Sequence, residues 1–193
     1  HKEYRRQRQM CIRDSGKDLT KDFQQVKHRY PMLSLANTYN EEELFDFDRR
    51  IREALNVEEV EYVVELKIDG VSISLIYEKG KFVTAATRGD GETGEEVTNN
   101  IKTIKSVPLS ISKRKLEEHN ISSFEVRGEI FMEINEFEKL NDERLQQGEK
   151  LFANPRNFAS GTIKLQDPSI VAKRKLSIFT YYLLGDEVSF NTH

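Results

Sequence analysis

A lysine stands between two carboxylates in the segment VVELKIDGVSISLIYEKGK, residues 63–81. In an extended chain Glu65, Lys67 and Asp69 point to one side and the apolar residues between them to the other. We therefore predict a strand over residues 63–69 with one charged face. A lysine amine that has lost its proton is a nucleophile, although carboxylates beside it favour the protonated form. A salt-bridged strand surface without chemistry explains the same spacing, and both interpretations stay open.

Two further segments carry polar groups that could serve a ligand. In TRGDGETG, residues 87–94, three glycines follow Arg88, which suits a backbone that approaches a ligand closely and a guanidinium that binds phosphate. Taken alone, such a segment is more often a plain loop. In EVRGEIF, Glu125, Arg127 and Glu129 have the period of one strand face. Two charged faces in one small sheet indicate a polar cleft.

The remaining polar candidates are weaker. Arg156 and Asn157 lie in NPRNFASG, a segment of small residues that suits either a phosphate or sugar contact or ordinary turns. His28 and His119 have no metal-ligand spacing, and a core or solvated role is expected for both. Cys11 is the single cysteine, which excludes an internal disulfide and a Cys-based zinc site within these residues.

Two kinds of element must position these residues. NEEELFDFDRRIREALN predicts a helix that Asn40 caps, with Glu43 completing a capping box, and an apolar stripe follows the helical period. That stripe consists of Leu44, Phe47, Ile51 and Leu55. The alternating runs 71–78 and 81–88 predict two strands joined by a tight turn at Lys79-Gly80.

Four more elements follow along the chain. Thr93 and Glu96 have capping-box spacing and predict a helix start, with Val97, Ile101 and Ile104 on one helix face. We predict strands over 122–132 and 176–184, a helix from about Asn135 to Gln147 that Gly148 ends, and a loop or short helix over 152–168. The fold class is α+β with a mostly antiparallel sheet and flanking helices.

Composition limits the class of protein. The 193 residues are enough for one domain of ordinary size, with 37% hydrophobic and 33% charged residues. No apolar run reaches the roughly 18 residues of a membrane helix. Residues 1–15 are basic and without apolar periodicity, which predicts a disordered or non-native leader. The net charge of −3 predicts weak affinity for DNA by these residues alone.

Several segments together resemble a known family. ELKIDG is similar to the lysine–x–aspartate–glycine motif of covalent nucleotidyltransferases. PMLSLANTY, the run from ELKIDG to KSVP, EVRGEIFM, FANPRNFASGT and LQDP occur in the order found in bacterial NAD-dependent DNA ligases, from about residue 16 to about residue 184. The resemblance implies an α+β nucleotidyltransferase domain of the ATP-grasp-like adenylation type, with residues 16–193 forming a part that is incomplete at both ends.

The resemblance also implies roles for single residues. Lys67 matches the lysine that attacks the adenylyl phosphorus of NAD and holds AMP as a phosphoramidate, and Asp69 matches an electrostatic or metal-linked partner. The positions that match cofactor contacts are Ser34, Leu35, Glu65, Arg88, Glu129 and Tyr181. Of these, Glu129 is expected to bind the ribose. The positions that match contacts to the nick or its phosphate are Arg156 and Lys164, a lysine where many members carry arginine.

Cofactors and partners follow from the same resemblance. It implies NAD and Mg²⁺, with Mn²⁺ as a possible substitute, nicked double-stranded DNA as the substrate, and a cytoplasmic monomer that serves DNA repair and replication. Zn²⁺ is expected only in a four-cysteine module outside these residues. A second lysine-bearing motif is also absent, so we expect no ligation by this chain alone. An ATP-using nucleotidyltransferase, a non-catalytic nucleotide- or DNA-binding module and a Schiff-base lysine enzyme remain as alternatives.

Overall fold

The computed structural model describes residues 23–185, which divide into two compact units. One unit contains residues 23–32 and 68–185, and the other contains residues 33–67. The expected leader, residues 1–15, and Cys11 within it lie outside the described residues. None of the helices in the described part of the chain combines the length and the apolar character that crossing a membrane requires.

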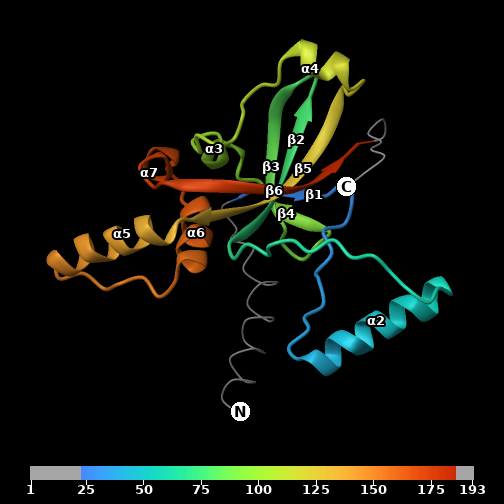
Figure 1. The fold of residues 1–193 in the computed structure, drawn as a ribbon. Helices are drawn as coiled ribbons and strands as arrows, with labels where there is room; N and C mark the ends of the chain where they lie inside the picture. The colour runs from blue at the N-terminus through green and yellow to red at the C-terminus, as the bar shows by residue number, and fades with distance from the viewer. Residues whose placement is uncertain (1–22, 186–193) are drawn as a thin grey trace. The chain divides into compact units, whose positions relative to one another are not determined.

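An antiparallel sheet of four strands organises the larger unit, in the order β3–β2–β5–β6 (Figure 1). Its strands are β2 (Val71–Glu78), β3 (Lys81–Thr87), β5 (Ser123–Met132) and β6 (Leu176–Leu184). Lys79 and Gly80 connect β2 to β3 with φ angles of 49° and 74°. Two consecutive left-handed residues make the tight turn that matches strand twist, so the predicted hairpin is confirmed.

A second, two-stranded sheet pairs β1 (Gln25–Lys27) with β4 (Thr93–Glu95). The predicted capping box at Thr93 and Glu96 is therefore wrong. Thr93 lies in β4 opposite Lys27, because β1 supplies a hydrogen-bonding partner from a distant part of the chain.

The helix that follows starts later than predicted. It is the short helix α3 (Thr98–Ile101), and its N-cap Val97 makes no side-chain bond. The apolar set predicted for this region is nevertheless in the core: Val97, Ile101 and Ile104 are each at most 4% exposed.

The described residues of the larger unit contain four further helices: α4 (Lys113–Glu118), α5 (Ile134–Gln146), α6 (Pro155–Ile163) and α7 (Pro168–Ala172). The sequence prediction missed α4. It placed α5 correctly to within one residue, and Gly148 follows that helix with a φ of 70°. The segment predicted as a loop or short helix contains α6, which Asn154 caps by accepting a hydrogen bond from the Asn157 N–H (2.7 Å).

The hydrophobic core lies on one face of the four-stranded sheet. Ile73, Leu75 and Tyr77 of β2 alternate with polar residues and are at most 2% exposed. Helix α6 contacts β5 and β2 and adds Ala159 and Ile163 to the same core. The opposite face of the sheet is thus left to the polar residues of the strands.

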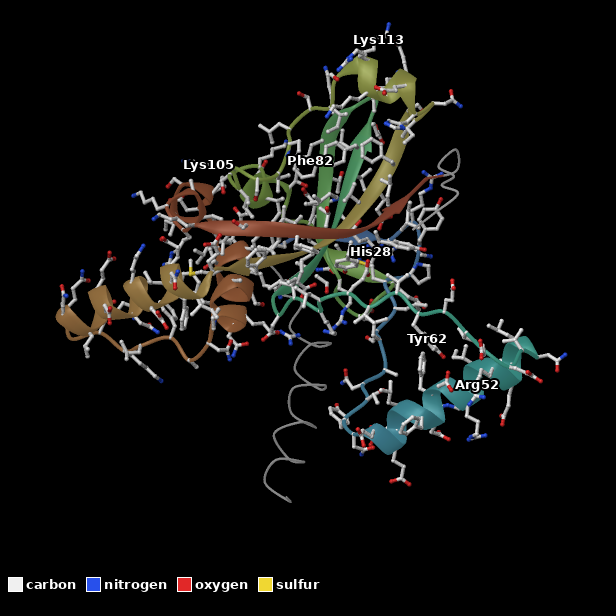
Figure 2. The ribbon with its side chains drawn as sticks, in the orientation of Figure 1. His28, Arg52, Tyr62, Phe82, Lys105 and Lys113 are labelled. Atoms are coloured by element: carbon white, nitrogen blue, oxygen red, sulfur yellow. The ribbon has the colours of Figure 1, made fainter. Side chains whose placement is uncertain are left out.

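The smaller unit contains α2 (Glu41–Leu55). Asn40 Oδ1 accepts from the Glu43 N–H (2.8 Å), and Glu43 Oε2 accepts from the Tyr39 N–H (2.9 Å), so the predicted capping box is confirmed. Tyr62, labelled in Figure 2, contacts Phe47 and donates a hydrogen bond to Asp48 Oδ1 (2.9 Å).

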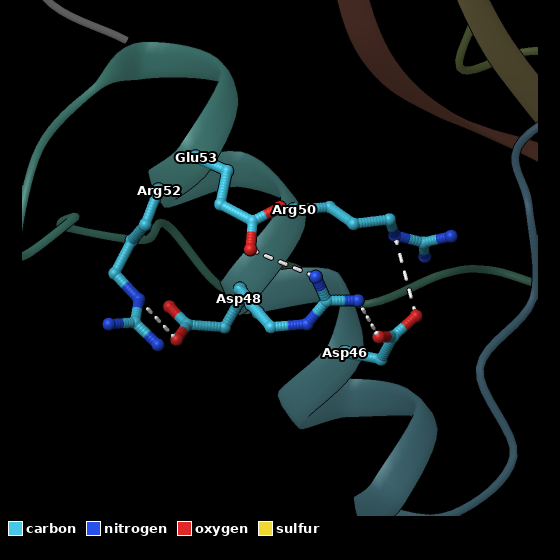
Figure 3. A network of polar contacts seen from close by, with 6 residues as sticks. Asp46, Asp48, Arg50, Arg52 and Glu53 are labelled. Carbon is cyan, nitrogen blue, oxygen red and sulfur yellow. Dashed lines mark hydrogen bonds and ion pairs between the residues drawn. The ribbon is translucent and has the colours of Figure 1, made fainter.

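The apolar stripe predicted on α2 has the expected period, but within the described residues it is covered only in part, by Tyr62 against Phe47. No residue of the helix is buried, and Leu44 and Leu55 are more than half exposed. The polar side chains of the helix pair along its surface at i,i+3 and i,i+4 spacing, as Figure 3 shows. Those side chains are Asp46, Asp48, Arg49, Arg50, Arg52 and Glu53.

The predicted strand over residues 63–69 is wrong. Residues 61–69 have no regular structure, and Val64 and Leu66, which the alternation would bury, are 93% and 82% exposed. Pairing of β2 with β5 begins only at Val71, opposite Ile130. A strand needs a hydrogen-bonding partner as well as an alternating sequence, and the described residues offer none to this segment.

Candidate functional site

The polar face of the four-stranded sheet gathers several of the predicted site residues. Across β2 and β5, Ser72 lies opposite Glu129 and Ser74 lies opposite Arg127. Residues that face each other across paired strands share a side of the sheet, so these four lie on the side away from the core. The predicted alignment of Glu125, Arg127 and Glu129 on one strand face follows from the same register.

One part of this face is closed by the protein itself. Arg127 Nε donates to Glu125 Oε1 (2.7 Å), and both side chains are almost fully buried. The same guanidinium donates to the Pro31 carbonyl (3.0 Å) and to the Tyr30 carbonyl (2.6 Å). A buried charge needs such complete pairing. Arg127 therefore fastens residues 30–31 to the sheet.

The neighbouring part of the face is partly exposed and contains the polar side chains of Ser72, Glu129 and Tyr181. Ser72 Oγ donates to Glu129 Oε2 (2.8 Å). The Tyr181 phenol lies near the Glu129 carboxylate, and it is 45% exposed. Burial, and then the nearby Glu129 carboxylate, raise the pKa of Tyr181 above its ordinary value, so this phenol is a hydrogen-bond donor at neutral pH.

A bulge in β6 accompanies this placement of Tyr181. Arg127 of β5 pairs with Tyr182, while the next residue, Gly128, pairs with Thr180. Tyr181 is the extra residue between these pairs. A bulge redirects the side chains around it. Simple alternation along β6 therefore could not predict that Tyr181 lies near Glu129.

Arg88 follows β3 and begins a loop that is held by its own backbone. Its N–H donates to the Ser72 carbonyl (3.2 Å), and its carbonyl accepts from the Gly91 N–H (3.0 Å) and from Nε2 of the buried His28 (3.1 Å). The expectation of a core role for His28 is confirmed. Arg88 thereby enters the loop next to Ser72, and its side chain is partly buried.

An aspartate and a glycine fix the shape of that loop. Asp90 Oδ1 accepts from the N–H groups of Thr93 (2.7 Å) and Glu92 (2.9 Å), and these bonds lower the pKa of Asp90. Gly89 has a φ of 57°, and a Cβ there would lie 1.9 Å from the Thr93 carbonyl oxygen. The chain's own backbone thus accounts for this glycine.

Asp69 and Arg156 form an ion pair at the start of β2. Arg156 Nη1 lies 3.2 Å from Asp69 Oδ1, and both side chains are at least half exposed. Arg156 is in the first turn of α6, so this pair links that helix to the residue before Gly70. A Cβ at Gly70 would lie 2.2 Å from the Ile130 carbonyl oxygen, which explains why a glycine follows the aspartate.

Lys164 ends α6 and is paired with a carboxylate that the sequence reasoning did not single out. Its Nζ lies 2.6 Å from Glu95 Oε2, and the Glu95 side chain is only 1% exposed. Glu95 is in β4, which the prediction read as the approach to a helix, so no sequence signal placed it beside Lys164. The phosphate contact expected of Lys164 stays a prediction.

The other predicted site residues belong to residues 33–67. Ser34, Leu35, Glu65 and Lys67 are all exposed in that unit. Lys67 is its last residue and precedes β2 by only four positions. Within residues 23–185 no three His, Cys, Asp or Glu side chains form a group that could hold a metal ion.

Comparisons with known proteins agree with the resemblance. A family model described as "NAD-dependent DNA ligase adenylation domain" matches residues 20–193. Proteins named DNA ligase from Bacteroides fragilis, Thermotoga maritima and a Sulfurihydrogenibium species are 52%, 53% and 57% identical over 100%, 89% and 86% of this chain.

The matched part of each relative is 28%, 24% and 23% of its length, so the chain spans about a quarter of these relatives. The α+β architecture with antiparallel sheets is the one that the resemblance implied. Since the family model covers residues 20–193 and relatives more than half identical cover most of the chain, this chain belongs to the NAD-dependent DNA ligase adenylation domain family.

Proposed function

We propose that this chain is a partial adenylation domain, residues 16–193, which transfers AMP from NAD to Lys67 as the first step of DNA ligation. The observation that carries the proposal is the KIDG motif, in which Lys67 lies four residues before β2 in the sequence and Gly70 is required by the β5 backbone. Membership of the family supports the choice of NAD as the AMP donor.

The proposed chemistry uses the same phosphorus atom twice. The Lys67 amine, having lost a proton, attacks the adenylyl phosphorus of NAD, and the bond to nicotinamide mononucleotide breaks. AMP is then held by a phosphorus–nitrogen bond. A 5′-phosphate oxygen at a DNA nick attacks the same phosphorus and releases the Lys67 amine. Finally the 3′-hydroxyl attacks the activated 5′-phosphate, closes the strand and releases AMP.

The polar face of the sheet supports a role in nucleoside binding. The carboxylate of Glu129 is a hydrogen-bond acceptor suited to a ribose hydroxyl, and Tyr181 adds a protonated phenol beside it. Arg88 is the cation that leaves β3 next to Ser72 and would bind phosphate. Ser34, Leu35 and Glu65 complete the proposed contacts with the nucleotide from the residues before Lys67.

Two cations at the ends of α6 are the proposed contacts to the nick. Arg156 is oriented by Asp69 and remains half exposed, so its guanidinium can also accept a phosphate partner. Lys164 ends α6 with a partly exposed ammonium group, which is the second proposed phosphate contact. We propose nicked double-stranded DNA as the substrate, and a cytoplasmic monomer as the acting species.

Magnesium, or manganese in its place, would neutralise phosphate charge during the transfer. The described residues fit this because Mg²⁺ in such sites is held largely by phosphate oxygens and water, with one or two carboxylates from the protein. Asp69, the exposed aspartate of the motif, is the proposed carboxylate. The remaining donors would come from the nucleotide and from water.

The test is adduct formation on a single lysine. The protein, expressed from its complete reading frame, is incubated with labelled NAD or labelled ATP and Mg²⁺ and analysed by denaturing mass spectrometry. We expect the mass of adenylate on Lys67 from NAD alone, and none in Lys67→Arg, which keeps the charge but not the amine. Lys115→Arg, an exposed lysine of α4, is the matched control and should react normally.

Other outcomes decide between the alternatives. Labelling by ATP in place of NAD would indicate an ATP-using nucleotidyltransferase. Nucleotide binding without any covalent adduct would indicate a binding module. Trapping by borohydride would indicate a Schiff-base lysine. A normal adduct yield in Lys67→Arg would contradict the proposal directly.

A further inference from the structure

Ser72 occupies a central position on the open part of the polar face. It lies directly opposite Glu129 across β2 and β5, and its hydroxyl donates to Glu129 Oε2 at 2.8 Å. One short side chain of β2 therefore holds a carboxylate of β5.

The chemistry of the two groups fixes the direction of this hydrogen bond. An ionised carboxylate only accepts, so the single hydroxyl proton of Ser72 must point to Glu129. Glu129 Oε2 is thereby held by a donor from the neighbouring strand.

We infer that Ser72 is a positioning residue, which orients the Glu129 carboxylate for the ribose of the adenosine nucleotide. This rests on the proposed function, since it assumes that adenylate occupies the polar face. The geometry carries it: the Ser72–Glu129 bond fixes one carboxylate oxygen across the paired strands β2 and β5.

A purely structural role fits the surroundings of Ser72 less well. Ser72 and Glu129 are both partly exposed, so their hydrogen bond is in reach of water and is not needed to satisfy buried groups. Ser74, two residues along the same strand face, is only 2% exposed and lies opposite Arg127. Ser74 thus provides a matched control for loss of a serine hydroxyl at a buried position.

The experiment measures self-adenylation by the protein expressed from its complete reading frame. Ser72→Ala should raise KM for NAD about tenfold, which is the loss expected for one hydrogen bond to a charged group, and leave kcat nearly unchanged. Ser72→Thr keeps the hydroxyl and should restore most of the affinity. Ser74→Ala should lower the unfolding temperature and leave KM for NAD near that of the unsubstituted protein.

Two further comparisons separate positioning from folding. In a Glu129→Gln background, Ser72→Ala should add little to KM, because the two residues act as a unit. NAD analogues that lack the 2′- or the 3′-hydroxyl of the adenosine ribose provide the second comparison. With the analogue that lacks the hydroxyl bound by Glu129, Ser72→Ala should no longer raise KM. An undiminished penalty with both analogues would overturn the inference, as would an unchanged KM in Ser72→Ala.

The outcome also distinguishes this inference from the proposed function. If Lys67 forms the adduct and Ser72→Ala changes nothing, the role of Ser72 alone is refuted. If no adduct forms in the unsubstituted protein, the proposed function is refuted. Calorimetric binding of AMP to the unsubstituted protein and to Ser72→Ala then decides the role of Ser72, with equal affinities counting against it.

Discussion

The ion pair between Lys164 and Glu95 gives the sharpest stability prediction. Lys164 Nζ and Glu95 Oε2 are 2.6 Å apart, and the two side chains are 24% and 1% exposed. Lys164→Met removes the ammonium from a carboxylate that has almost no access to water. Breaking a buried pair on one side typically costs about 3–5 kcal/mol, and the partial exposure of the lysine favours the lower end. We expect a loss of about 3 kcal/mol in the free energy of unfolding.

A surface pair in the same protein is the control. Lys113 and Glu117 are 3.3 Å apart in α4, with side chains 88% and 66% exposed. Lys113→Met removes the same charge and adds the same side chain, yet exposed pairs at this spacing contribute only about 0.3–0.5 kcal/mol. Because both variants change the net charge equally, the difference between them reports burial of the pair.

Urea unfolding followed by circular dichroism measures both variants. A third protein, Glu95→Leu with Lys164→Met, removes both charges and should recover most of the lost stability, because an apolar pair of similar volume replaces a buried ion pair with little net cost. If Lys164→Met destabilises no more than Lys113→Met, the reasoning from burial is wrong. The same conclusion follows if the double variant is less stable than Lys164→Met.

Two further predictions concern backbone positions in the larger unit. Gly70→Ala should lower the unfolding temperature markedly, because its Cβ would lie 2.2 Å from the Ile130 carbonyl oxygen. Gly161→Ala in α6 is the control, because its Cβ meets no atom within 4 Å and should stabilise the protein by about 0.4–1 kcal/mol. Equal shifts of the unfolding temperature in the two variants would contradict this. The hydrogen bonds from Thr93 and Glu92 lower the pKa of Asp90, so its stabilising effect is complete above the ordinary value of 3.8 and disappears as the pH falls through the lower folded value. Thermal melts from about pH 5 to about pH 2.5 should therefore show a steeper loss for the unsubstituted protein than for Asp90→Asn, and parallel curves would refute it.

Local patterns predicted the elements whose causes are local. The β2–β3 hairpin follows from Lys79-Gly80, and the start of α2 follows from the reciprocal bonds of Asn40 and Glu43. Both depend on residues within a few positions of each other. Helix α5 was placed correctly for the same reason, because its apolar period and the glycine after it are read within one segment.

Elements that depend on distant partners were not predictable in the same way. Strand β4 exists because β1 pairs with it, and Thr93 and Glu96 carry a helix signal that this pairing overrides. The alternation at residues 63–69 is a real feature of the sequence, but alternation does not supply a neighbouring strand. The prediction therefore failed where the hydrogen-bonding partner was decisive.

For the candidate site too, local patterns were predictable and contacts with distant residues were not. The period of two along β5 predicted that Glu125, Arg127 and Glu129 share a face. It could not predict that Arg127 and Glu125 neutralise each other while Glu129 reaches Ser72, since these contacts come from the β2–β5 register and from residues 30–31. Glu95 was missed because its importance comes entirely from Lys164, almost seventy residues later.

The bulge in β6 has a consequence for what this strand can offer a ligand. In a regular strand consecutive side chains point to opposite sides, so two adjacent tyrosines could never face the same way. Here Tyr182 pairs with Arg127 and Phe179 pairs with Glu129, and the side chains of Arg127 and Glu129 lie on the same side of the sheet. Phe179 and Tyr182 are three residues apart, so in a regular strand they would lie on opposite sides. The phase of the strand has shifted by one residue, so that Phe179 and Tyr182, which are 47% and 53% exposed, present aromatic surface on the same side of the sheet.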